Sequence, residues 1–301
     1  MPAVSPRTPL RTAMSFHALA TPSVAARIVA STGLAPPATV YEIGAGDGML
    51  TAALLETGAN VIAIERDRQL ALGLRQRFGA NQRCSVISAD ALRFPFPDAG
   101  NYRLIANPPF AITAGLLRRL TALPNPPVCT ALVLQREAAW RWSGIHEESA
   151  LSVIAKVGFH FEVLLPLRRR DFRPFPSVDC VLLGMRRRLV PLVRRADQHA
   201  FGLFVRLGFE GGRGSVRRNL ESFLPYHQFR AAAQQARVAV DEAPSRIAAD
   251  QWVSLFSAVS IDLTRGRRRE PWRVQRQRVG GGSHEAKADR PLPLSDERPP
   301  G

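Results

Sequence analysis

The tetrapeptide Asn107-Pro108-Pro109-Phe110 holds the residue types that most directly suggest chemistry. An exocyclic amine or a side-chain amide nitrogen is a poor nucleophile, because its lone pair is delocalised into the neighbouring π system. Asn107 Oδ1 and the Pro108 carbonyl can accept hydrogen bonds from both N–H groups and so localise that lone pair. The prolines fix the backbone, which establishes orientation before reaction. Phe110 is suited to stack on a flat substrate, such as a base turned out of its helix or loop. The pattern predicts methyl transfer to a planar amino nitrogen, with Asn107, Pro108 and Phe110 as catalytic residues.

A glycine turn precedes the tetrapeptide, in the stretch Glu42-Ile43-Gly44-Ala45-Gly46-Asp47-Gly48. Gly44 and Gly46 allow the chain to pass close to a ligand. The stretch is a shortened relative of the dinucleotide fingerprint, so nicotinamide or flavin binding is an alternative. The full fingerprint is absent, because the stretch reads Gly44-Ala45-Gly46-Asp47-Gly48-Met49, without its third glycine.

Two acidic residues follow the next apolar runs and favour S-adenosylmethionine (SAM) over those alternatives. Glu65 ends the run 61–64 and is placed to accept hydrogen bonds from both ribose hydroxyls, while Asp90 follows the run 85–87 and can accept from the adenine amino group. With the glycine turn and the tetrapeptide in this order, the sequence predicts a SAM-dependent methyltransferase without a metal.

The elements that must position these residues alternate between strand and helix. Strands are expected at 40–43, 61–64, 85–87, 103–106 and 129–135, and helices at 22–33, 50–55, 67–78 and 112–123. Two more strands are expected around 157–164 and 181–185. This alternation predicts an α/β fold, a Rossmann-like methyltransferase domain with a mostly parallel, doubly wound sheet. Each polar residue named above then falls at the carboxyl end of a strand, where such sheets bind ligands.

The character of the sequence changes after about residue 190. Residues 194–207, 215–224, 226–237 and 245–259 have helical apolar spacing and lack strand signals. We therefore expect four segments: a flexible arm (1–14), a catalytic domain (15–190), a small all-helical RNA-binding domain (191–263) and a disordered basic tail (264–301).

The chain carries a formal net charge of +16, which calls for an anionic partner, and nucleic acid is the leading one. The tail explains part of the charge only, because residues 264–301 hold ten basic against five acidic residues. No apolar stretch approaches the roughly 18 residues of a membrane span, and no secretion signal is evident. Cys84, Cys129 and Cys180 lack metal-ligand spacing. We expect a cytoplasmic protein, acting as a monomer without membrane contact.

These motifs together resemble the rRNA adenine N6-methyltransferase superfamily, over about residues 13–260. The resemblance rests on the stretches above, on Ser15-Phe16-His17-Ala18-Leu19, on Gln251-Trp252 and on Phe172-Arg173-Pro174-Phe175-Pro176-Ser177-Val178-Asp179. The last segment is the specific one, since general methyltransferases lack it. By position the resemblance implies that Phe110 and Phe172 sandwich the flipped adenine. It also implies cofactor contacts from nine residues: His17, Leu19, Gly44, Ala45, Gly46, Glu65, Asp90, Ala91 and Asn107.

Within the superfamily the sequence is more similar to the erythromycin-resistance (Erm) branch. That branch methylates an adenine of 23S rRNA in the peptidyl-transferase region and confers macrolide, lincosamide and streptogramin B resistance. KsgA-type dimethyltransferases of 16S rRNA, usually Asn-Leu/Ile-Pro-Tyr, are the alternative within the family. Pro108 stands where this family usually has Ile or Leu. Pro at this position matches broader amino-methyltransferases that act on DNA adenine or glutamine, which are a rival enzyme hypothesis. Phe16-His17-Ala18-Leu19 departs from the family's entry motif. A non-catalytic RNA-binding protein of the same fold is a third hypothesis.

Overall fold

The computed structural model describes residues 17–210 and 214–265. The expected arm (1–14), the residues Ser15 and Phe16, and the tail beyond residue 265 lie outside the described residues. In chain order the first elements are β1 (Ala18–Leu19), α1 (Pro22–Ser31), β2 (Thr39–Ile43), α2 (Met49–Glu56), β3 (Asn60–Glu65), α3 (Arg68–Phe78), β4 (Cys84–Ser88), β5 (Arg103–Ala106), α4 (Phe110–Ala122) and β6 (Cys129–Gln135). They are followed by α5 (Arg136–Ser143), α6 (Ala150–Lys156), β7 (Phe159–Leu167), β8 (Phe172–Arg173), β9 (Cys180–Arg187), α7 (Gln198–Phe209), α8 (Val216–Leu220), α9 (Tyr226–Ala236) and α10 (Ala249–Arg265).

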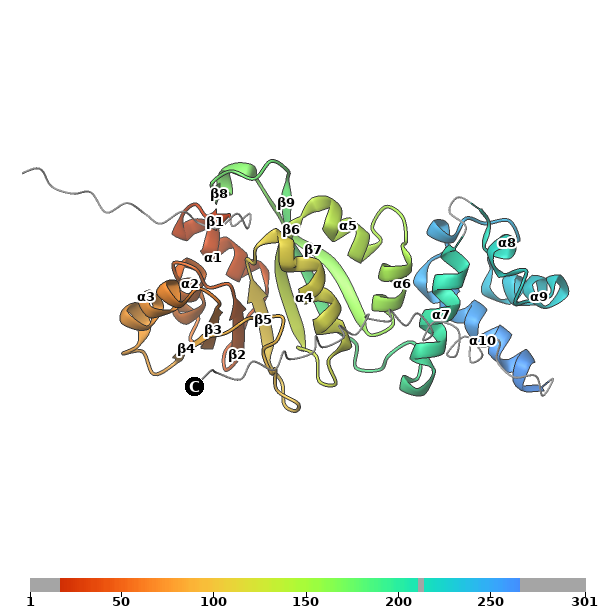
Figure 1. The fold of residues 1–301 in the computed structure, drawn as a ribbon, viewed down its shortest axis with the longest axis horizontal. Coiled ribbons are helices and arrows are strands. Elements are labelled where there is room, and N and C mark those ends of the chain that lie inside the picture. Colours follow the sequence, from red (N-terminus) through yellow and green to blue (C-terminus); the bar gives the residue numbers. More distant parts are fainter. Residues whose placement is uncertain (1–16, 211–213, 266–301) are drawn as a thin grey trace, which may run out of the picture.

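A seven-stranded sheet organises the first two thirds of the chain, with strand order β4-β3-β2-β5-β6-β9-β7. Strands β2 to β6 pair in parallel, whereas β9 is antiparallel to both of its neighbours. Separate apolar clusters cover the two faces, one built around α4 and α5 and the other around α1 and α2. Figure 1 shows this sheet with helices on both sides. The predicted α/β fold, a mostly parallel sheet between helices, is thereby confirmed.

Local sequence explains how the strands near the glycine turn end. Gly44, Gly46 and Gly48 adopt φ values of 70°, 59° and 82°, a region that costs other residues about 1–2 kcal/mol. Asp67 caps the N-terminus of helix α3, because its carboxylate accepts hydrogen bonds from the backbone N–H groups of Gln69 and Leu70. Each strand therefore passes into a defined turn at the same edge of the sheet.

A second, two-stranded sheet lies at this edge and joins distant parts of the chain. Strand β1 pairs with β8 in antiparallel fashion, Ala18 opposite Arg173 and Leu19 opposite Phe172. Figure 1 shows the pair at one end of the main sheet, beside β9. The pair forms because Leu19 and Phe172 are both buried in the cluster that includes α1.

The C-terminal helices α7 to α10 form a separate group beside the sheet (Figure 1). Their apolar cluster is centred on Trp252, Phe201 and Phe229, which are all fully buried, and it also takes Val153 and Val157 from the α6 region. The helical part is therefore packed onto the sheet part. The boundary expected at residue 190 stays a prediction. Helix α10 runs through residues 264 and 265, which the sequence assigned to the tail.

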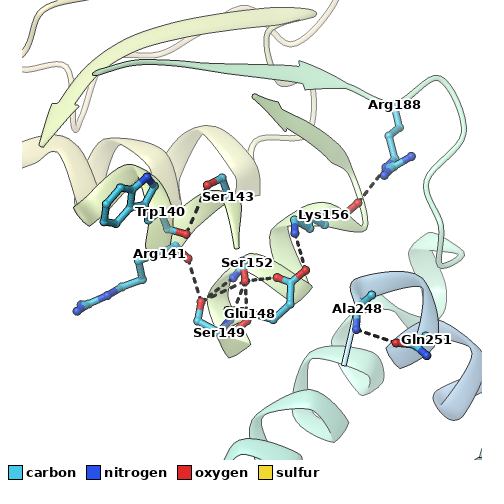
Figure 2. A network of polar contacts seen from close by, with 10 residues as sticks. All are labelled: Trp140, Arg141, Ser143, Glu148, Ser149, Ser152, Lys156, Arg188, Ala248 and Gln251. Atoms are coloured by element: carbon cyan, nitrogen blue, oxygen red, sulfur yellow. Dashed lines mark hydrogen bonds and ion pairs between the residues drawn. The ribbon is translucent and has the colours of Figure 1, made fainter. Parts of the chain in front are cut away.

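Helices α5 and α6 were not expected from the sequence. Helix α5 begins directly where β6 ends, and α6 begins at a capping box formed by Ser149 and Ser152. Figure 2 shows the polar network that fixes the turn between them, centred on Glu148. Glu148 accepts hydrogen bonds from Ser152 and Lys156, and its backbone N–H donates to the Ser245 carbonyl of the helical part at 2.8 Å. This turn is therefore one of the joints between the two parts.

Candidate active site

Asn107 stands directly after β5 and is 7% exposed. Its Nδ2 donates a hydrogen bond of 2.8 Å to the carbonyl of His17, which directly precedes β1. This bond fixes the orientation of the amide, because only the nitrogen can donate. Within the described residues no donor engages Asn107 Oδ1, so this atom is left to accept a hydrogen bond from a ligand.

The glycine turn packs directly against this asparagine. The Gly44 N–H donates to the Ile64 carbonyl at 2.8 Å. A Cβ atom on Gly44 would lie 3.7 Å from both the Asn107 carbonyl oxygen and the Pro108 Cα, so the two motifs are in contact. A pocket opens between them, lined by Ala18, Leu19, Glu42, Gly44, Ala45, Asp47, Met49, Leu50 and Asn107. Four of the predicted site residues, Leu19, Gly44, Ala45 and Asn107, thus share one pocket.

Glu65 lies at the carboxyl end of β3, beside the glycine turn, and is 7% exposed. Its Oε2 accepts from the Gly46 N–H at 3.0 Å, and its Oε1 accepts from the Asp67 N–H at 2.8 Å. The carboxylate is thereby held in one orientation by two turns. Each oxygen retains a further lone pair, so the proposed contact with ribose hydroxyls remains open to it.

Asp90 and Ala91 follow β4, the next strand of the sheet. Asp90 Oδ1 accepts from the Leu92 N–H at 2.9 Å, which turns the chain, and Ala91 is buried. Neither residue lines the pocket between the glycine turn and Asn107. Their contact with the adenine amino group stays a prediction, supported by their position at the same edge of the sheet.

Glu42 is a buried acid of this pocket that the sequence reasoning left without a role. It is 1% exposed, and Thr51 Oγ1 donates a hydrogen bond of 2.6 Å to its Oε2. Burial raises the pKa of Glu42 to about 8, against the lowering effect of the Thr51 hydrogen bond. A cation in the pocket would offset that cost and favour the carboxylate. The sequence signal that could have identified Glu42 is its position at the start of the glycine motif.

The two aromatic residues expected around the substrate, Phe110 and Phe172, differ in how much of the ring is exposed. Phe110, the first residue of α4, is half-buried, and its ring lies 5.1 Å from the ring of His17. Phe172 is 0% exposed and packs in the core cluster beneath β1. In this structure the Phe172 ring therefore has no exposed face to offer a substrate base.

The arrangement as a whole suits a cationic methyl donor and a planar amine. It combines a close-approach glycine turn, a buried acid, a fixed carboxylate at a strand end and an amide oxygen free to accept. Over residues 17–210 and 214–265 no group of His, Cys, Asp and Glu side chains is arranged to hold a metal.

Comparison with known proteins decides the family. The family model described as ribosomal RNA adenine dimethylase matches residues 8–260. The chain belongs to this family.

Individual relatives also match this chain over most of its length. A ribosomal RNA small subunit methyltransferase A from Synechococcus sp. (strain RCC307) is 35% identical over 82% of this chain and 95% of its own length. An rRNA adenine N-6-methyltransferase from Aeromicrobium erythreum is 30% identical over 90% of this chain and 80% of its own. The crystal structure of the 23S rRNA methyltransferase ErmE superposes with a TM-score of 0.73 at 28% identity, covering 81% of this chain and 99% of that one.

Membership of the ribosomal RNA adenine dimethylase family makes the chain a SAM-dependent rRNA adenine methyltransferase, as the motifs predicted. Within the described part of the chain, no helix has the length and apolar character to cross a membrane.

Proposed function

We propose that this methyltransferase acts on N6 of one adenine in the peptidyl-transferase region of 23S rRNA, as a cytoplasmic monomer, and so confers macrolide, lincosamide and streptogramin B resistance. The observation that supports this choice is the similarity to ErmE, which extends over 99% of that chain with a TM-score of 0.73. The Aeromicrobium relative points to the same reaction class.

The chemistry follows from the geometry around Asn107. SAM supplies an electrophilic methyl group on a sulfonium. Asn107 Oδ1 and the Pro108 carbonyl accept hydrogen bonds from the adenine amino group and aim its lone pair at that methyl. A nitrogen–carbon bond forms while the carbon–sulfur bond breaks, leaving S-adenosylhomocysteine. The methylated nitrogen then releases a proton to solvent, so a strong general base is unnecessary.

A second candidate is dimethylation of small-subunit rRNA during ribosome maturation. It is favoured by the 35% identity to the small subunit methyltransferase A of Synechococcus, of which this chain covers 95%. The two candidates share the fold, the methyl donor and the catalytic residues. They differ in the RNA that is bound.

The deciding experiment offers labelled SAM with protein-free 23S rRNA and, separately, with small-subunit particles, and maps the label by primer extension. We expect label on a single adenine of the peptidyl-transferase loop, and reduced macrolide sensitivity when the gene is expressed in a sensitive bacterium. Label confined to small-subunit particles would replace the proposal by the second candidate. Label on neither substrate would contradict both candidates.

A further inference from the structure

The segment 174–179 projects beside the candidate site and presents apolar side chains to solvent. Phe175 is 54% exposed and Val178 is 41% exposed. The guanidinium of Arg173 stacks over the Phe175 ring, 5.5 Å from its centroid. An exposed aromatic ring paired with an arginine is a surface that nucleic-acid bases stack on.

This segment is held at several points. Pro174 O is hydrogen-bonded to His17 Nδ1 at 2.8 Å, and Pro176 O accepts from Arg169 Nε at 2.7 Å. Asp179 forms an ion pair of 2.8 Å with Arg136, and its carbonyl accepts from the Arg136 N–H at 2.9 Å. The backbone on both sides of Phe175 is therefore held, which lowers the entropy cost of binding a partner.

A second arginine–aromatic pair follows on α5. The guanidinium of Arg136, which pairs with Asp179, lies 5.1 Å from the ring centroid of Trp140. His146 packs edge-on against the same indole at 4.2 Å. Figure 2 shows Trp140 and Arg141 projecting from α5, away from the network around Glu148. The Arg136–Asp179 ion pair thus ties the second pair to the segment 174–179 that carries Phe175.

Direct contacts also link the first pair to the tetrapeptide. Phe110 packs on His17, and the His17 ring is hydrogen-bonded to Pro174, the residue before Phe175. The contacts from Phe110 therefore reach Pro174, and the segment 174–179 leads along the chain from there through Phe175 to Asp179, whose partner Arg136 lies against Trp140.

The electrostatics of this surface favour a polyanion. The exposed side chains of Arg168, Arg169, Arg170 and Arg173 directly precede the segment in the chain. Asp171 among them is buried, and Asp179 in the segment is 48% exposed but ion-paired with Arg136. Asp171 pairs with Arg27 at 3.5 Å. Arginine side chains among stacking rings can contact phosphates while the rings bind bases.

We propose that the pairs Arg173–Phe175 and Arg136–Trp140 form a stacking track for the unpaired RNA nucleotides next to the target adenine. This inference rests on the proposed reaction with RNA and adds the residues that bind its flanking bases. Phe175, and not the buried Phe172, supplies the exposed ring of the segment 172–179.

The test uses the full-length protein and an RNA stem-loop with an unpaired target adenine, carrying 2-aminopurine on either side of it. Stacking on Phe175 or Trp140 quenches 2-aminopurine fluorescence. In Phe175→Ala we expect this quenching to be lost and the KM for RNA to rise about tenfold or more, the scale of one base–aromatic stack. The kcat and the Kd for SAM stay unchanged, because the ring touches neither reacting group.

Matched variants separate stacking from folding. Phe175→Trp should restore quenching and KM, and Arg136→Gln should raise KM while leaving the SAM Kd in place. Leu72→Ala removes a side chain of similar exposure (55%) on α3 and should behave as wild type.

The inference is overturned if Phe175→Ala and Arg136→Gln bind the stem-loop with wild-type affinity and wild-type fluorescence. Failure of the proposed function would look different. The wild-type protein would then quench the probe and lose quenching in Phe175→Ala, yet transfer no methyl group to 23S rRNA.

Discussion

The Asn107 side chain uses its nitrogen and its oxygen for different partners. Its Nδ2 is occupied by the His17 carbonyl, which directs Oδ1 to the pocket. Replacing Asn107 by Ala should lower kcat by about a hundredfold or more, since single preorganised hydrogen-bonding groups act on this scale. Asn107→Asp keeps an acceptor but sets a carboxylate oxygen against the His17 carbonyl, so we expect it to lose activity as well.

Single-turnover methyl transfer and SAM binding measure these effects separately. Asn60→Ala, at an exposed position at the start of β3, is the control and should retain full activity. Activity of Asn107→Ala close to wild type would remove the amide from the mechanism.

Glu42 should give the free protein a characteristic pH dependence. Burial raises its pKa from 4.5 to about 8, so the folded state holds a proton that the unfolded state has released over this range. The contribution of this group to stability is therefore full below pH 4.5 and is lost as the pH rises to about 8. In Glu42→Gln this loss is absent, because the amide cannot titrate. The free energy of unfolding of the variant should therefore increase relative to that of wild type between pH 5 and 8.

Urea unfolding across this pH range tests the prediction, with exposed Glu56→Gln as the control that should follow wild type. Binding of a cationic ligand strengthens as the pH rises, because the cation favours the charged Glu42 carboxylate. SAM binding to wild type should release a proton near neutral pH, seen by calorimetry in two buffers, and Glu42→Gln should not. Parallel pH profiles for variant and wild type would contradict the assignment.

The residues named from the sequence that line the pocket depend on local signals. Gly44, Ala45 and Asn107 follow apolar strands, so their position at one edge of the sheet follows from the strand pattern. The burial of Phe172 follows instead from the pairing of β8 with β1, which lies far earlier in the chain. The hydrogen-bonded residues beside this pair, His17 and Pro174, are 157 positions apart. Long-range pairing of two-residue strands leaves no periodic signal in the sequence.

At the level of elements, the β1–β8 pair positions the His17 carbonyl over Asn107, and Phe172 anchors that pair in the core. Phe172→Ala should lower the free energy of unfolding by about 3–5 kcal/mol, the cost of emptying a buried aromatic site. Phe172→Leu retains most of the apolar volume and should keep both kcat and the KM for RNA near wild type.

Chemical denaturation and steady-state kinetics on the two variants distinguish a core role from a stacking role. If Phe172→Leu were stable but raised the KM for RNA as strongly as Phe175→Ala, the ring would have to leave the core and meet the substrate.

The missed helices α5 and α6 show why connections are harder to predict than strands. Helix α5 starts at the residue after β6, with no loop between them. Its apolar residues include Trp140 and Trp142, which a strand could equally bury. Helix α6 is short, and its start depends on the Ser149–Ser152 capping box and on Glu148 from the same turn.

At the scale of the whole molecule, Glu148 connects the sheet part with the helical part. Its side chain is 9% exposed and pairs with Lys156, which is 21% exposed. Glu148→Gln leaves that ammonium without its partner and should cost about 3 kcal/mol of stability, the lower end for broken buried pairs because Lys156 keeps some solvent. Thermal or urea unfolding measures the loss.

Asp197→Asn is the matched control, because it breaks the Arg194–Asp197 pair in which the arginine side chain is 87% exposed. We expect a change of about 1 kcal/mol or less there. Equal effects of the two variants would mean that the joint around Glu148 is as solvated as the surface.

The reversal of one strand has a consequence for how such enzymes diversify. Because β9 runs against β6 and β7, the connection from β7 to β9 crosses the edge where the methyl donor site lies. Residues 168–179 thus connect two strands at this edge, and within them Phe172 and Arg173 hold β1 in place. Target preference can change at the exposed positions 174, 175, 177 and 178, while the β1–β8 pair and the sheet are kept.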